Sequence, residues 1–246
     1  MPFLGFFVLL LVWDILARFS GWSRQVFPGP VVVLVSLAEL LVDGTLVRHT
    51  VASLYRVTVG FYLAAILGIP LGIGLGMMKS VRSLTNPLIQ FLRPISPLAW
   101  IPLAMLWFGI GDPPAIFLIF LSSFFPLVVS TTIAVDGINP IFFHVAANFN
   151  FSRLETISRL IIPAIIPEVV TALRMTVTIS WLVVVAAEMI AVQSGLGFLI
   201  LDSRNALRMD YVMDGMIVIG LVGLTLDYLM RLLGKLEIAG WRRMSN

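Results

Sequence analysis

The sequence predicts an all-α, polytopic integral membrane protein with six transmembrane helices per chain. Of its 246 residues, 59% are hydrophobic and only 12% are charged, whereas soluble domains carry roughly 25% charged residues. The mean hydropathy of the chain is +1.04. Six apolar runs are judged against the roughly 20 residues that a helix needs to cross a bilayer. Together they leave no room for a second globular domain.

The first run, about Pro2–Phe19, is interrupted only by Asp14. It begins without a basic segment, which indicates a retained membrane helix rather than a cleaved signal peptide. A turn at Phe27–Pro30 follows, and Val31–Val42 predicts a short interfacial helix. We therefore expect residues 1–48 to hold the first transmembrane helix and the interfacial helix, and residues 49–246 to form the core transmembrane domain.

The second run, about Val57–Met78, carries three glycines on one helical face, at Gly68, Gly72 and Gly76. Small residues at this spacing let another helix approach closely, so we expect helix packing there. Gly72, Gly74 and Gly76 also form a G-x-G-x-G pattern. Because no strand precedes it, the pattern does not indicate a nucleotide-binding loop.

The third run, about Ile95–Ile110, is short and contains Pro97 and Pro102. Irregular backbone at membrane depth is tolerated only where protein or a water-filled cavity surrounds it, which favours an interior position. A tight turn at Gly111–Pro114 then leads into the fourth run, about Ala115–Val135.

The C-terminal half adds two further runs, about Ile165–Val192 and Val212–Leu233, joined by a connection at Gln193–Tyr211. Basic residues orient the six runs. Nine lie on one side: Lys79, Arg82, Arg93, Arg153, Arg159, Arg231, Lys235, Arg242 and Arg243. Six lie on the other: Arg18, Arg24, Arg48, Arg56, Arg204 and Arg208. This bias predicts that both termini and the loop at 140–163 are cytoplasmic.

The stretch Pro140–Pro167 is the longest break between apolar runs in the C-terminal half, and it is too polar for the bilayer core. Apolar residues nevertheless recur at helical spacing on both sides of a polar break at Asn150–Arg153. Ser152 followed by Glu155 predicts a capping box that starts the second helix. A helix, a turn and a second helix are therefore expected, a loop suited to being held by another protein.

This loop resembles the EAA loop of ABC-importer permeases, whose pattern is EAA-x3-G-x9-I-x-L-P. The aliphatic and proline end fits, with Leu160, Ile162 and Pro163 in the Ile, Leu and Pro places. Ala146 takes the second Ala place, whereas His144 replaces the usual Glu and Asn150 the usual Gly. The resemblance covers nearly the whole chain and is to permeases for nitrate, bicarbonate, sulfonates and taurine. It is carried also by Ser53–Met77, Leu92–Asp112, Val183–Arg204 and Gly215–Leu233.

The resemblance implies a type I ABC-importer permease in the bacterial plasma membrane, which forms the path for a small anion such as nitrate, bicarbonate or taurine. Its implied partners are cytoplasmic ABC ATPase subunits, a second and identical permease chain, and an extracytoplasmic binding protein. ATP and magnesium are then bound by the ATPase subunits and no cofactor by this chain. The implied ATPase-coupling residues are Phe142, His144, Ala146, Phe149, Asn150, Phe151, Ser152, Arg153 and Pro163.

The fifth run holds a stripe of polar and charged residues on one helical face: Thr171, Arg174, Thr178, Trp181 and Glu188. Ionisable groups inside a membrane mark a functional site by default, so this stripe is a candidate substrate pathway. The alternative is that Arg174 and Glu188 are neutralised by neighbours such as Asp136, Arg56 or Asp214 and only hold the bundle together.

No catalytic motif is found. The chain lacks a phosphate-binding loop, an HExxH motif and cysteine, so no enzyme activity or metal site is expected. The net charge of +3 is modest, and no nucleic-acid partner is expected. A secondary transporter or channel is the alternative function. It would require internal repeats and carboxylates deep in several spans, which the sequence lacks.

Overall fold

A computed structural model describes residues 2–19, 21, 23 and 26–244, and its regular elements in this part are all helical. The N-terminal half contains α1 Pro2–Phe19, α2 Pro30–Val42, α3 Thr45–Met77, α4 Lys79–Leu92, the 3₁₀ helix η1 Pro97–Trp100, α5 Ile101–Phe108 and α6 Asp112–Asp136. The C-terminal half contains α7 Pro140–Asn148, α8 Arg153–Glu155, the π-helical turn η2 Thr156–Ile161, α9 Ile162–Ala191, α10 Leu196–Asn205 and α11 Met209–Met244.

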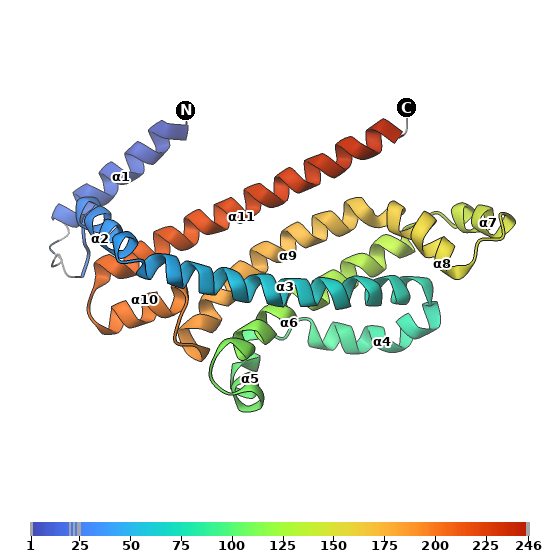
Figure 1. Ribbon diagram of the computed structural model, residues 1–246, viewed down its shortest axis with the longest axis horizontal. Helices are drawn as coiled ribbons and strands as arrows, with labels where there is room; N and C mark the ends of the chain where they lie inside the picture. The colour runs from blue at the N-terminus through green and yellow to red at the C-terminus, as the bar shows by residue number, and fades with distance from the viewer. Residues whose placement is uncertain (1, 20, 22, 24–25, 245–246) are drawn as a thin grey trace.

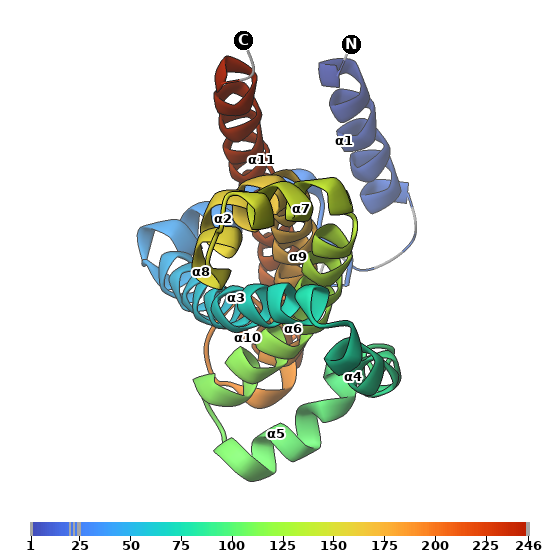
Figure 2. The same ribbon diagram turned by 90° about the vertical axis from the view of Figure 1, so that its right-hand side faces the viewer.

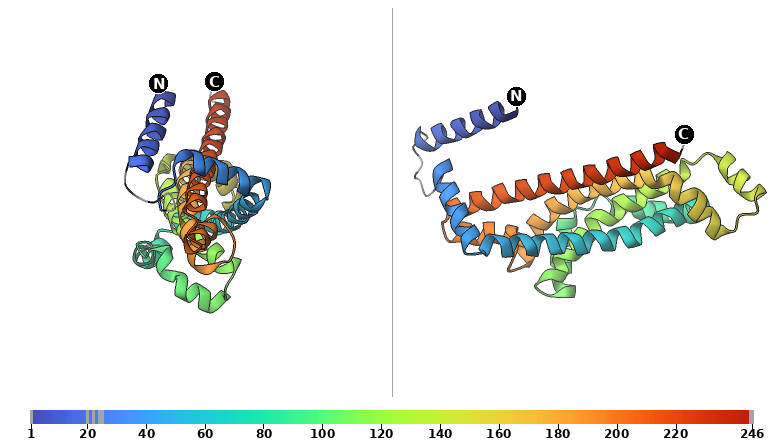
Figure 3. Two further views of the ribbon diagram at one scale, coloured as in Figure 1. Left: turned by 90° about the vertical axis from the view of Figure 1, so that its left-hand side faces the viewer. Right: turned by 45° about the horizontal axis from the view of Figure 1, so that its top comes forward.

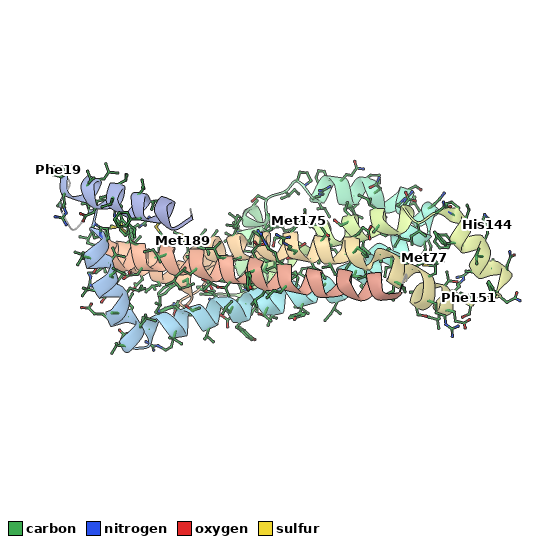
Figure 4. All side chains as sticks on the ribbon, turned by 90° about the horizontal axis from the view of Figure 1, so that it is seen from above. Phe19, Met77, His144, Phe151, Met175 and Met189 are labelled. Carbon is green, nitrogen blue, oxygen red and sulfur yellow. The ribbon has the colours of Figure 1, made fainter. Side chains whose placement is uncertain are left out.

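The long helices α3, α6, α9 and α11 form an elongated bundle (Figure 1). Figure 4 places His144 and Phe151 at one tip of the molecule and Met77, the last residue of α3, near that same end. Phe19 and Met189 lie toward the other end. We call the end that carries α7 and α8 the inner end, and the end that carries α10 the outer end. α1 stands beside the bundle and packs against α2 (Figure 3).

α3 and α6 are parallel and touch along most of their length, because glycine on α3 removes the side chains that would separate them. A Cβ atom built on Gly72 would lie 2.6 Å from Cβ of Thr131, and one on Gly76 would lie 2.5 Å from Cβ of Val135. Gly68 faces Leu127 at 3.4 Å. The structure thus places the three glycines of the predicted packing face against α6.

Four helical segments of the described residues are long and apolar enough to cross a membrane: Thr45–Met77, Asp112–Asp136, Arg153–Ala191 and Met209–Leu232. A fifth span results if α4 and the η1–α5 segment are taken together as one broken span. The structure therefore establishes a polytopic helical protein, and the six predicted spans are not confirmed.

The third predicted run, Ile95–Ile110, corresponds to η1 and α5, and the residues between the second and third runs form an additional helix, α4. Lys79–Leu92 and Pro97–Phe108 are both helical, but their axes are bent by 85°. Pro94 and Pro97 interrupt the backbone hydrogen bonding between them. Figure 2 shows α4 and α5 standing away from the bundle, and Leu106 and Ile110 are largely exposed in the single chain.

The helix α4 also moves a charged residue away from its expected place. Lys79 begins α4 at the inner end, and α4 then doubles back along the bundle, so Arg93 lies at its far end rather than in a loop beside Lys79 (Figure 1). Of the other basic residues in the orientation argument, Arg24 lies outside the described residues, as do the side chains of Lys235, Arg242 and Arg243.

Three further boundaries differ from the sequence-based expectations. α3 begins at Thr45, so the expected domain boundary after residue 48 falls inside this helix. The connection at 193–211 contains a regular helix, α10. Pro163 and Pro167 do not end the helix: α8, η2 and α9 form one continuous helical segment from Arg153 to Ala191.

Candidate functional site

The inner-end segment, residues 140–163, is fixed by local chemistry. Asn139 accepts a hydrogen bond from the backbone N–H of Ile141 and caps α7, whose first residue is Pro140. Asn150 ends the turn after α7 with φ of 54°, a left-handed conformation that asparagine tolerates better than most residues. Ser152 and Glu155 then form the capping box that the sequence predicts, which is confirmed.

The turn between α7 and α8 is held by several contacts. The N–H of Phe151 donates to the carbonyl of Ala146 over 3.0 Å, and Ala146 is buried. The ring of Phe151 packs against Phe149, and the guanidinium of Arg159 lies 5.7 Å above it. The two helical pieces are thus joined rigidly, because backbone bonds and ring contacts act on the same four-residue turn.

The exposed surface of this inner-end segment is largely apolar. Phe149 is 71% exposed and Leu154 is 78% exposed. Other exposed apolar residues of α7 are Ile141, Phe142 and Val145. His144 is exposed at the tip of the molecule, as Figure 4 shows, and Arg153 is exposed as well. A rigid knob with a large apolar surface has the form of an amphipathic helix that binds in a groove of a partner.

At the outer end, Arg56 is the centre of a charge network. Its side chain is only 2% exposed and forms ion pairs with Glu188 at 2.6 Å and with Asp112 at 2.7 Å. It also donates to the carbonyl and the hydroxyl of Ser194. Arg56 therefore joins α3, α6, α9 and the start of the α10 connection.

Glu188 has further donors inside this network. The hydroxyl of Ser53 donates to it over 2.8 Å, and so does the N–H of Gly197 over 3.0 Å. Glycine is required close by, because a Cβ atom on Gly195 would lie 2.2 Å from Cδ of Glu188. The carboxylate is thus fully paired, and it anchors α10 to α9.

The residues of the predicted stripe on α9 contact different parts of the protein and do not form one site. Arg174 pairs with Asp227 of α11 at 3.2 Å, and Thr171 and Thr178 donate to carbonyls within α9. Trp181 is buried, and its indole N–H donates to the carbonyl of Ile219. These contacts favour the interpretation that the charges hold the bundle together. Glu188 pairs with Arg56, one of the neighbours the sequence suggested, whereas Arg174 pairs with a different one.

Among the described residues, no group of three or more His, Asp or Glu side chains is arranged to hold a metal ion. The geometry instead offers a rigid apolar knob at the inner end and a charge-linked cluster of helices at the outer end.

Residues 68–237 match the family model described as "binding-protein-dependent transport system inner membrane component". The taurine transport system permease protein of Escherichia coli is 35% identical to this chain, over 93% of this chain and 85% of that protein. The nitrate import permease protein of a Synechocystis strain is also 35% identical, over 96% and 88%. The bicarbonate transport system permease protein of Synechococcus elongatus is 36% identical, over 92% and 85%.

Solved structures share the fold. The structure of a bacterial ABC transporter involved in the import of the acidic polysaccharide alginate matches with a TM-score of 0.67 and 14% identity, over 96% of this chain and 93% of that one. An inward-facing methionine ABC transporter matches with a TM-score of 0.66 and 17% identity, over 81% and 97%. At these identities the likeness concerns the fold alone.

Proposed function

The chain belongs to the binding-protein-dependent transport system inner membrane components, and from this premise we propose how it connects ATP hydrolysis by its partners to the movement of a small anion. It is the permease subunit of an ABC importer of the nitrate, bicarbonate, sulfonate and taurine type. It is not an enzyme and carries no cofactor, because ATP is hydrolysed by separate ATPase subunits.

The inner-end segment is the proposed contact with the ATPase. The observation that carries this proposal is the exposed apolar surface of α7 on a rigid turn, with Phe149 at 71% exposure. Phe142 and Phe149 would enter a groove of the ATPase, and Phe151 would support the turn from within. His144 stands where this loop usually has a carboxylate, so its contact with the ATPase must differ from a carboxylate–cation pair.

The proposed cycle is alternating access. ATP binding closes the ATPase pair and draws two copies of the inner-end segment together. Because η2 and α9 continue directly from this segment, the movement is transmitted to the bundle without a flexible joint. The permease thus exchanges between two states whose populations ATP biases. Two identical permease chains are proposed, both with cytoplasmic termini, in the plasma membrane.

The proposed substrate class is a small anion, namely nitrate, bicarbonate or a sulfonate such as taurine. Relatives named for these anions match nearly the whole chain at about equal identity, which supports the class and does not select a member. A secondary transporter is disfavoured because the buried carboxylate Glu188 is fully paired and is not available for coupling to an ion.

The coupling proposal is tested by co-purification with the co-expressed ATPase subunit. Phe149→Ser is expected to abolish co-purification, because truncating a central interface aromatic costs ~2 kcal/mol or more, roughly 30-fold in affinity. Phe19→Ser is the matched control, since Phe19 is 81% exposed and lies toward the opposite end of the molecule (Figure 4). Deletion of 144–152 should also release the ATPase. Retention of the ATPase by both the Phe149→Ser variant and the deletion would refute the contact.

A further inference from the structure

A groove with a volume of about 780 Å³ lies between α4 and the α3–α6 pair. Small-molecule sites typically measure about 300–1,000 Å³, so the groove is large enough to hold a small ion with its water. Its α6 wall is mainly apolar, from residues such as Val128 and Ile133. Its α4 wall carries polar side chains along one helical face: Thr85, Asn86, Gln90 and Arg93.

The groove runs along α6, one of the segments long and apolar enough to cross a membrane. Arg82 lines its inner part and pairs at 2.8 Å with Asp136, the last residue of α6. Arg93 lies 11 positions further along α4, which is about 16 Å of helix rise toward the outer end. α6 itself is about 37 Å long, so Arg93 lies near the middle of the span. The sequence alone placed this residue in a cytoplasmic loop.

The charge inside the groove is unbalanced. None of the described residues that line it is Asp or Glu, and the charge of Arg82 is compensated by Asp136. Within the part of the chain that the structure describes, Arg93 forms no ion pair, and its side chain is exposed to the groove. An unpaired guanidinium at membrane depth is costly, and such groups are normally stabilised by water or by a partner of opposite charge. Arg174, by contrast, already has Asp227.

We propose that Arg93, with Gln90 and Asn86, forms an anion-binding site on the path through the permease. This proposal rests on the proposed function and assigns the substrate site within it. The guanidinium presents a planar fork of N–H donors, and each amide adds two more. Such a donor set suits the oxygens of nitrate, bicarbonate or a sulfonate. The positive charge of the guanidinium repels cations, because no carboxylate in the groove compensates it.

The first test uses the absence of cysteine from the chain. Gln90→Cys places one thiol about 6 Å from Arg93 on the same helical face. In proteoliposomes, the thiol is reacted with an anionic reagent, sulfonatoethyl methanethiosulfonate, and with a cationic one, trimethylammonioethyl methanethiosulfonate. The increase in mass of the permease chain gives the rate of each reaction. Adding Arg93→Gln should lower the anion-to-cation rate ratio about tenfold at low ionic strength, the effect of one unit charge at that distance in water.

A matched control is Leu84→Cys, an 80% exposed position of α4 that does not line the groove. Its rate ratio should not change with Arg93→Gln. A Gln90→Cys thiol that reacts with neither reagent would show that the groove is not aqueous. A rate ratio that Arg93→Gln leaves unchanged would show that a second chain or another group already neutralises Arg93. Either result overturns the site.

The second test asks whether the site lies on the path. Arg93→Gln should reduce uptake of labelled nitrate, bicarbonate or taurine by the reconstituted complex about tenfold or more, the loss expected for one charge-assisted hydrogen bond, while the ATPase subunit still co-purifies. Lys79→Gln removes a cation from the same helix outside the groove and should leave uptake unchanged. Equal uptake by the Arg93→Gln complex would overturn the pathway role.

The two proposals fail in different ways. If the unchanged chain co-purified with no ATPase, the coupling proposal would fail, yet the cysteine rates would still decide the anion site. If the reconstituted complex took up none of the three labelled anions, the rate ratio at Gln90→Cys alone would decide whether the anion site exists.

Discussion

Arg56 shows how one residue can organise an entire end of the bundle. Removing a guanidinium and a carboxylate from water is expensive, and their attraction compensates only when the remaining donors and acceptors are also satisfied. Arg56 and Glu188 meet this condition through Asp112, Ser194, Ser53 and Gly197. The network therefore specifies how α3, α6, α9 and α10 fit together.

Removing the buried charge of Arg56 should lower the free energy of unfolding far more than removing the half-exposed charge of Asp112. Arg56→Met leaves Glu188 buried without its cation and is expected to cost about 3–5 kcal/mol of unfolding free energy. Asp112→Asn is the control: because the Asp112 side chain is 49% exposed, its loss should cost at most about 1 kcal/mol. Thermal unfolding in detergent, followed by size-exclusion chromatography, measures both. Equal stability of the two variants would contradict the structural role of Arg56.

At the level of elements, the α3–α6 contact depends on glycines whose missing side chains let the two backbones approach. Gly60, Gly72 and Gly76 each leave less than 3 Å between a built Cβ atom and α6. The glycine at 74 lies on the other side of the same helix, with nothing within 4 Å. Position on the helix therefore decides the cost of a methyl group, and the residue type alone does not.

This contrast gives a matched pair of substitutions in one helix. Gly72→Ala must separate α3 from α6 and is expected to lower the free energy of unfolding by about 1–3 kcal/mol. Gly74→Ala meets open space and should stabilise the helix by up to about 1 kcal/mol, because alanine is the better helix former. Thermal unfolding of the two proteins compares them directly. A Gly72→Ala protein as stable as the Gly74→Ala protein would show that the close helix contact is absent.

The α4–α5 region shows where element prediction stops. Prolines at 94, 97 and 102 mark irregular backbone in the sequence, and the structure is irregular there. The direction of an 85° bend depends on what the chain packs against, which hydropathy does not encode. The stretch between the second and third predicted runs therefore forms the helix α4, and Arg93 lies at the end of this helix rather than in the expected loop.

For the whole molecule, local contacts could be predicted from the sequence, whereas distant pairings could be given only as alternatives. The capping box at Ser152 involves residues three positions apart, so the sequence predicted it. Arg56 and Glu188 are 132 positions apart. The sequence offered Arg56 as one of three neighbours, and only the folded chain shows that it is the partner. Periodicity identifies a helix and its apolar face, whereas the partner of a buried charge is set by topology.

The orientation of the whole molecule follows from its two ends. Figure 1 places the inner-end segment and the end of α11 toward one end of the bundle and α10 at the other. Basic residues are in excess on the side that carries the inner-end segment, which predicts that this end is cytoplasmic. ATPase subunits are cytoplasmic as well, so the charge argument and the coupling proposal require the same orientation.

Single cysteines in this cysteine-free chain test the orientation. In right-side-out spheroplasts, a membrane-impermeant maleimide should label Arg204→Cys on α10 and should not label His144→Cys at the inner tip, because only the outer end faces the reagent. After permeabilisation both proteins should be labelled, and the unchanged chain should take up no label in either state. Labelling of His144→Cys in sealed spheroplasts would reverse the orientation. It would also place the apolar knob of α7 outside, where no ATPase could bind it.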